Sequence, residues 1–245
     1  MTDWLAPSDW LAPSDWLAPS DWQALVLSLK VASLATLASL PFGIWIAWIL
    51  ARKSFPGHDI LNGLVHLPLI LPPVATGYLL LIAFGKQGWA GAFLFEHFGL
   101  VLAFRWTGAA LAGAVMAFPL LVRAIRLAFE AVDPGLEAAA ATLGAGRMTV
   151  FFSVSLPLAL PGVLAGAVVG FAKAMGEFGA TITFVANIPG QTQTLPTAIY
   201  TALAVPGGEA HAARLVGISI LIAMLALVLS EVLARWLAAR IRGRR

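Results

Sequence analysis

The chain has 245 residues, of which 60% are hydrophobic and only 11% are charged, and its mean hydropathy is +0.89. This composition excludes a soluble globular domain and indicates an integral membrane protein. The formal net charge is +3 and cysteine is absent, which excludes disulfides, thiolate catalysis and cysteine-based metal sites.

The N-terminus carries the hexapeptide DWLAPS three times over residues 3–20. Each copy contains a proline, and so short a unit with a proline cannot sustain a helix or bury a face. We therefore expect residues 1–21 to be a disordered tail that arose by tandem duplication. The alternative is that its tryptophans anchor the tail at the outer membrane interface, where indole rings are favoured.

Five apolar stretches are long enough to cross a bilayer, which requires about 20 helical residues. We expect an all-α integral membrane protein with five transmembrane helices in one domain, residues 22–238, followed by a basic cytoplasmic tail, residues 239–245. The predicted spans are residues 23–50, 60–84, 108–128, 158–186 and 212–236.

Lysine and arginine residues are distributed unevenly between the two sides of these spans. Ten of the fifteen fall on one side, namely Arg52, Lys53, Arg123, Arg126, Arg147, Arg235, Arg240, Arg242, Arg244 and Arg245. The positive-inside rule makes that side cytoplasmic, so the N-terminus is expected outside and the C-terminus inside. The net positive charge therefore indicates membrane orientation and not a nucleic-acid partner.

The expected cytoplasmic loop, residues 129–157, contains signals for a short helix. Asp133 can cap free backbone N–H groups, and Pro134 suits the first helical position. Glu137 follows near the positive end of the helix dipole, and Gly144 stands where helices often end in a left-handed conformation. A helix of about ten residues is marginal in water, so it needs a surface to dock on. That surface is either a groove of a partner protein or the lipid headgroups.

This loop resembles the EAA loop of permease subunits of ABC importers. The resemblance rests on a glutamate, two alanines and a downstream glycine: Glu137, Ala138, Ala139 and either Gly144 or Gly146. The family pattern has three residues between the second alanine and the glycine, whereas four separate Ala139 from Gly144. The resemblance implies that the segment is a coupling helix, which inserts into a cleft of a cytoplasmic ATPase subunit.

Three further stretches resemble permease subunits of molybdate importers: LPLILPPVATGYLLL (67–81), FPLLVRAIRLAFEAVD (118–133) and GEFGATITFVANIPGQTQTLPTAIYT (176–201). The resemblance covers nearly everything from residue 21 to about residue 240, and only the hexapeptide repeat departs from it. It implies the type I ABC importer permease fold in the inner membrane. It also implies a homodimer, cytoplasmic ATPase subunits that use ATP and Mg, and an external oxyanion-binding protein.

The chain itself is expected to be a transport subunit and not an enzyme, with no cofactor of its own. Only Lys86 follows a glycine, and its neighbours do not fit the phosphate-binding pattern G-x-x-x-x-G-K-[ST]. ATP hydrolysis is therefore assigned to a partner. The membrane potential of a cell that is negative inside opposes the entry of a dianion by about 4.6 kcal/mol per 100 mV. Import of molybdate therefore needs the energy of ATP hydrolysis.

Other functions are possible readings of the same residues. A permease for tungstate, sulfate or thiosulfate needs similar chemistry, because these are also oxyanions of the same charge. A passive anion channel offers no role for a capped cytoplasmic helix. A membrane enzyme with a metal site is disfavoured because the four histidines lack H-x-x-x-H or H-E-x-x-H spacing: His58, His66, His97 and His211.

Polar residues and prolines inside the spans are candidates for the transport pathway, because polar groups are costly in lipid. The candidates are Lys30, Pro72, Pro73, Lys173, Glu177, Thr181 and Thr183. Lys30 is expected to snorkel to the outer interface, with attraction of the anion as the alternative. The two prolines either kink the second span or shape a gate. Lys173 and Glu177 share one helical face, which predicts an ion pair; otherwise Glu177 reaches the outer headgroups.

Overall fold

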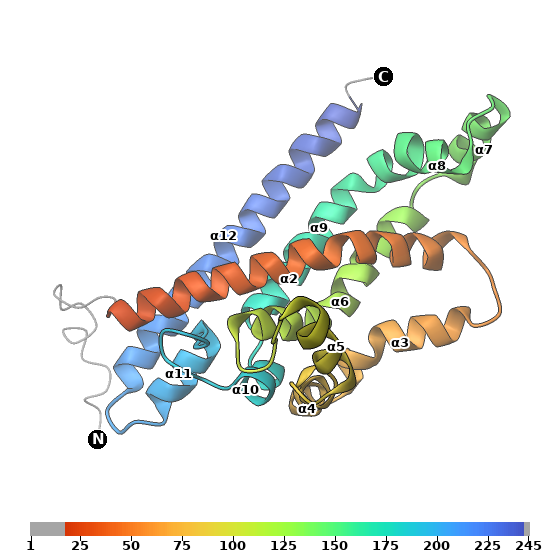
Figure 1. The fold of residues 1–245 in the computed structure, drawn as a ribbon. Coiled ribbons are helices and arrows are strands. Elements are labelled where there is room, and N and C mark those ends of the chain that lie inside the picture. The colour runs from red at the N-terminus through yellow and green to blue at the C-terminus, as the bar shows by residue number, and fades with distance from the viewer. Residues whose placement is uncertain (1–17, 243–245) are drawn as a thin grey trace.

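The computed structural model describes residues 18–242, and every regular element in that range is helical (Figure 1). Most of the hexapeptide repeat, which is expected to be disordered, lies outside the described residues. The elements are α2 (Pro19–Arg52), α3 (His58–Ile70), α4 (Pro73–Phe84), α5 (Trp89–Phe98), α6 (Trp106–Glu130), α7 (Pro134–Thr142), α8 (Arg147–Val150), the π-helical turn η2 (Phe151–Ser155), α9 (Leu156–Met175), α10 (Gly179–Val185), α11 (Leu195–Leu203) and α12 (Glu209–Arg242).

Four helical segments of the described chain are long and apolar enough to cross a membrane: α2, α6, the run from α8 through α9, and α12. The pair α3 and α4 makes a fifth span if it is counted as one broken helix. The number of spans is therefore four to five, and the fifth rests on the broken pair.

Two of the expected spans are not single helices. The second, residues 60–84, bends by 112° between α3 and α4. The bend falls at Pro72 and Pro73, because neither proline has an N–H to continue the helical hydrogen bonds. The prolines thus separate two helices and do not merely kink one. The fourth expected span, residues 158–186, is likewise divided, since α9 ends at Met175 and α10 begins at Gly179.

The helix α6 lies at the centre of the packing, between α2 and α9. One of its faces carries Leu121, Val122, Ile125 and Phe129, which are all fully buried. The facing side of α9 presents three glycines spaced four residues apart, Gly162, Gly166 and Gly170, and each lies against an α6 residue. An added Cβ would collide with α6 at Gly162 and Gly166 and would crowd it at Gly170, so the glycines allow the two helices to approach closely.

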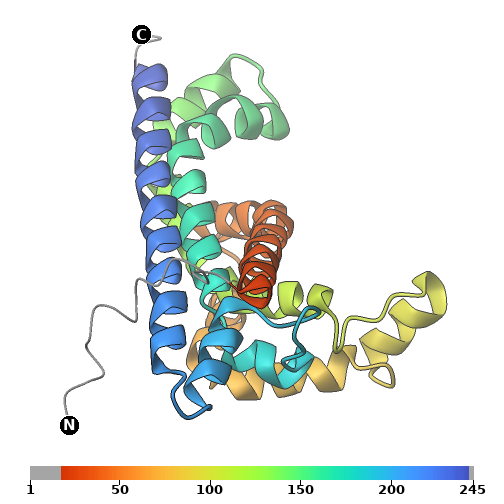
Figure 2. The same ribbon diagram turned by 90° about the vertical axis from the view of Figure 1, so that its left-hand side faces the viewer.

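The helices connect two distinct ends of the molecule. The helices α7 and α8 lie at one end, together with the C-terminal part of α12, which runs beside α9 (Figure 2). The helices α10 and α11 lie at the opposite end. The helix α2 joins the two ends. Its start approaches α12, where His211 Nε2 lies 2.9 Å from Asp21 Oδ1, and its last residue, Arg52, contacts α7. Asp21 is buried, so the ordered helix includes the end of the segment expected to be a tail.

Close packing between α4 and α10 yields a first prediction. A Cβ added at Gly77 would lie 2.5 Å from the carbonyl oxygen of Ala180, a backbone atom that cannot rotate away. We expect Gly77→Ala to lower the midpoint of thermal unfolding in detergent. The control is Gly217→Ala in α12, where an added Cβ meets nothing within 4 Å and helix propensity improves by up to about 1 kcal/mol. Equal midpoints for the two variants would contradict the packing argument.

Candidate coupling site

The expected short helix is present as α7, and its ends are formed by the residues that signalled it. Asp133 Oδ1 accepts a hydrogen bond of 2.8 Å from the backbone N–H of Gly135, and Pro134 is the first helical residue. After the helix, Gly144 has a φ of +88°, in the left-handed region that glycine tolerates best. Gly146 instead precedes α8 with a φ of −67°, so Gly144 is the residue that turns the chain.

One face of α7 is turned away from the rest of the subunit. None of its nine residues is buried. Ala138 and Ala139 present only small side chains, and Leu143 at the end of the helix is 89% exposed. A small-residue helix with an exposed leucine leaves room for another protein surface to come close.

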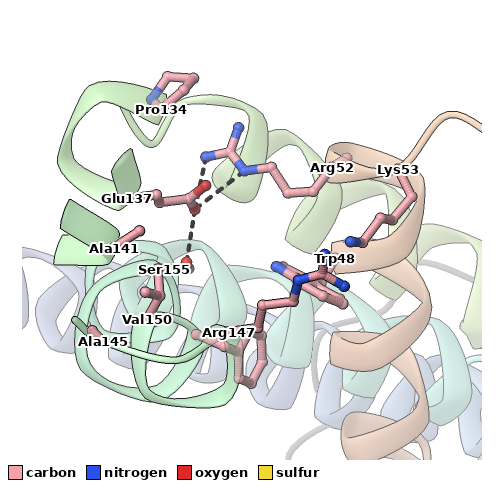
Figure 3. Close-up of a pocket in the computed structure, with 12 residues that line it drawn as sticks. Trp48, Arg52, Lys53, Pro134, Glu137, Ala141, Ala145, Arg147, Val150 and Ser155 are labelled. Atoms are coloured by element: carbon pink, nitrogen blue, oxygen red, sulfur yellow. Dashed lines mark hydrogen bonds and ion pairs between the residues drawn. The ribbon is translucent and has the colours of Figure 1, made fainter. Parts of the chain in front are cut away.

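Glu137 points inward, against α2 and η2, as Figure 3 shows. Its Oε1 accepts hydrogen bonds from Arg52 Nε at 3.2 Å and from Ser155 Oγ at 2.7 Å. Arg52 Nη2 also donates to the carbonyl oxygen of Val132 at 2.7 Å. We call this set the Glu137 clamp: Arg52, Val132, Glu137 and Ser155. Because its charged side chains are only 15% and 20% exposed, these hydrogen bonds are shielded from water.

The clamp forms one wall of a cavity of about 530 Å³ between α2, α7 and η2. Lys53 Nζ lies 5.4 Å from the centre of the Trp48 ring, and Arg147 also lines the cavity (Figure 3). Three cationic side chains therefore share the site with one carboxylate. Sequence reasoning used Arg52, Lys53 and Arg147 only to orient the protein. It missed their common site because Arg52 and Glu137 are 85 residues apart and no local pattern connects them.

Lys173 and Glu177 form the expected ion pair, with Lys173 Nζ 2.8 Å from Glu177 Oε2. The Glu177 side chain is only 2% exposed, so it does not reach outward as the alternative required. Its other oxygen accepts a hydrogen bond of 3.0 Å from the backbone N–H of Ala180 at the start of α10. Glu177 therefore joins the end of α9 to α10.

The remaining pathway candidates fall into two separate places. Pro73 packs against Gly179, and Thr183, whose hydroxyl donates to the Gly179 carbonyl oxygen at 3.0 Å, faces α4 near Gly77. Thr181 is buried in the same short helix, α10, and Pro72 stands at the α3–α4 break. Lys30 lies apart from them, with its Nζ 3.6 Å from the centre of the Trp106 ring. Among the described residues, no cluster of three or more metal-ligating side chains occurs.

Comparisons with known proteins show which family this chain resembles. The family described as binding-protein-dependent transport system inner membrane component matches residues 39–243. The chain is 61% identical over 213 residues to the molybdenum transport system permease protein ModB of Escherichia coli (strain K12), covering 87% of this chain and 93% of that protein. It is 54% identical over 219 residues to the ModB protein of Haemophilus influenzae, covering 89% and 94% of the two chains.

Among solved structures, the fold is similar to the MetNI methionine ABC transporter in inward-facing conformations. The TM-score is 0.66 at 16% sequence identity, and the match covers 97% of this chain and 99% of that one. At such low identity the match shows a shared fold.

The clamp predicts which substitutions loosen α7. Arg52→Gln removes the charged donors and leaves Glu137 held by Ser155 alone, so we expect the opening free energy of α7 to fall by about 1–3 kcal/mol. Hydrogen exchange of residues 134–142 measures this change. Lys53→Gln removes the neighbouring cation, which has no hydrogen bond to Glu137, and serves as the control. Equally fast hydrogen exchange in both variants would show that the general positive charge holds α7 in place, and not the hydrogen bonds of Arg52.

The Lys173–Glu177 pair is tested by a double-mutant cycle. Glu177→Gln leaves Lys173 without its partner inside the protein, which should destabilise the protein by about 1–3 kcal/mol, since Lys173 retains partial exposure. Adding Lys173→Met should recover part of the loss. Unfolding of the detergent-purified protein measures all four forms of the cycle. Strictly additive effects, without recovery, would mean that the pair contributes no coupling energy.

Proposed function

This chain belongs to the family of binding-protein-dependent transport system inner membrane components, and we propose that it is the membrane-spanning subunit of an ATP-driven molybdate importer. The observation that carries the proposal is 61% identity, over 87% of the chain, to a protein named as a molybdenum transport permease. The chain is a multi-pass protein of the inner membrane. In transporters of this family a separate subunit hydrolyses ATP.

The proposed assembly contains two copies of this chain, cytoplasmic ATPase subunits and an external binding protein that delivers the oxyanion. In it α7 docks in a groove of an ATPase subunit. Its exposed small residues and the 89% exposed Leu143 support this role. ATP and Mg bind the ATPase, and this chain holds no cofactor.

The Glu137 clamp supports a coupling role for α7. Since Arg52 ends α2 and also bonds Glu137 and the Val132 carbonyl oxygen, a displacement of α7 by the ATPase pulls on α2. The helix α2 packs along α6 and α9, so the displacement reaches the membrane-spanning bundle. Alternating access is the mechanism that this linkage serves, because a continuously open route would let a dianion leak out of a cell that is negative inside.

Reconstitution tests the proposal. The permease, its ATPase subunits and its binding protein are placed in proteoliposomes, and uptake of molybdate, tungstate and sulfate is measured with ATP and with a non-hydrolysable analogue. We expect molybdate uptake that depends on ATP hydrolysis. Leu143→Asp should insert normally and lose most of that uptake, because it places a charge on the docking surface of α7.

The other outcomes separate the alternatives. ATP-dependent uptake of sulfate without uptake of molybdate would assign the chain to a related oxyanion. Flux that follows the gradient and ignores ATP would indicate a passive channel. Full ATP-dependent uptake in Leu143→Asp would contradict docking through α7.

A further inference from the structure

A second polar cavity, of about 320 Å³, lies between α3 and α6 near the end of α6 that leads into α7. Its lining consists of Asn62, His66, Arg123, Arg126, Leu127 and Glu130. This cavity is separate from the one at the Glu137 clamp, and none of the functions described above uses it.

The cavity exists because α6 carries a polar stripe along one side of its last two turns. Arg123, Arg126 and Glu130 are spaced by three and four residues and so share one helical face. The opposite face, with Val122 and Ile125, is fully buried in the core. The stripe therefore faces away from the core and toward α3, and Arg123 lies about 10 Å from the end of α6 at 1.5 Å per residue.

Two of the polar groups are fixed in place. Arg126 Nη1 donates to Asn62 Oδ1 at 3.2 Å and its Nε donates to Glu130 Oε1 at 2.7 Å. His66 Nδ1 lies 2.8 Å from the carbonyl oxygen of Asn62, which can only accept, so Nδ1 carries the hydrogen. Asn62 thereby positions both an arginine and a histidine at the cavity.

Arg123 differs from its neighbour. It is exposed, it lines the cavity, and within residues 18–242 it has neither an ion pair nor a hydrogen bond. The cavity therefore holds two guanidinium groups and one carboxylate, and the unbalanced charge resides on Arg123. Membrane orientation alone accounts for positive residues at this end. It does not account for Arg126, which is bonded to Asn62 of the neighbouring helix α3 instead of extending to the headgroups.

We propose that this cavity is a binding site for the transported oxyanion at the cytoplasmic end of its route, a site for a tetrahedral dianion such as molybdate. The inference rests on the proposed function. Arg123 binds two oxyanion oxygens through its planar guanidinium, and Arg126 supplies a second, fixed cationic edge. Glu130 partly offsets the charge of Arg126 and so keeps the affinity low, as a site that must release its ion requires.

The absence of cysteine from the chain provides a direct probe of this site. Leu127 lines the cavity and is 59% exposed, so Leu127→Cys creates a single reporter thiol. The full-length protein is placed in nanodiscs and labelled with a negatively charged methanethiosulfonate reagent. We expect sodium molybdate to slow the labelling, whereas sodium chloride at equal ionic strength does not. In the same background Arg123→Gln should weaken protection about tenfold, the loss of one charged hydrogen-bonding group.

Matched variants isolate the cavity from general charge effects. Arg123→Lys keeps the charge without the planar fork. The molybdate concentration that protects this variant should lie between those that protect the Arg123 protein and Arg123→Gln. Lys86→Gln removes a cation that lies over the Phe95 ring, far from this end, and should leave protection unchanged. Leu143→Cys reports on the tip of α7, and its labelling should not respond to molybdate. Equal loss of protection in Arg123→Gln and Lys86→Gln would overturn the site.

Lipid composition and transport complete the test. Nanodiscs of phosphatidylcholine and of phosphatidylcholine with phosphatidylglycerol should give the same protection by molybdate. Slower labelling caused by phosphatidylglycerol alone, with no effect of molybdate, would make the cavity a lipid-headgroup site and overturn the proposal. Molybdate uptake by the unlabelled Leu127→Cys protein is measured in parallel. Uptake without protection overturns the site and leaves the function standing. Protection without uptake overturns the proposed function, and with it the assignment of the cavity to a transported ion.

Discussion

Close contact of α6 with both α2 and α9 is the constraint on which the rest of the structure depends. In a bilayer the lipid is as apolar as the side chains, so helices associate through tight van der Waals packing. The glycines of α9 permit this packing, because each lies against an α6 residue that a larger side chain would displace. Since α6 leads directly into α7, the same packing sets where the coupling segment leaves the bundle.

The coupling segment has two faces with different tasks. Its exposed alanines and Leu143 offer a surface to another protein, whereas Glu137 turns inward to Arg52 and Ser155. The glutamate of the family pattern thus serves, in this chain, to hold α7 against the end of α2. A helix of nine residues is too short to be stable by itself, and the clamp supplies contacts that the helix lacks.

Cationic residues at the end that holds α7 all satisfy the same rule of membrane orientation, yet their surroundings differ. Arg52 is bonded within the Glu137 clamp, Arg126 is bonded to Asn62 and Glu130, and Arg123 lines a cavity without a partner in the described part of the chain. A positive charge near the cytoplasmic side can therefore orient the protein, brace two helices or remain available to an anion. The neighbours of each residue, several of them contributed by other helices, distinguish these roles.

The sequence by itself determined the features that depend on composition and short spacing. Apolar length indicated the membrane helices, Asp133 and Gly144 indicated the ends of α7, and four-residue spacing indicated the Lys173–Glu177 pair. The tertiary structure decided the 112° break between α3 and α4 and the contacts of Arg52 with Glu137 and of Arg126 with Asn62, which span 85 and 64 residues. Local signals suffice where the interacting groups share one helix turn. Contacts between helices depend on crossing angles and depths of packing, which no short stretch of sequence encodes.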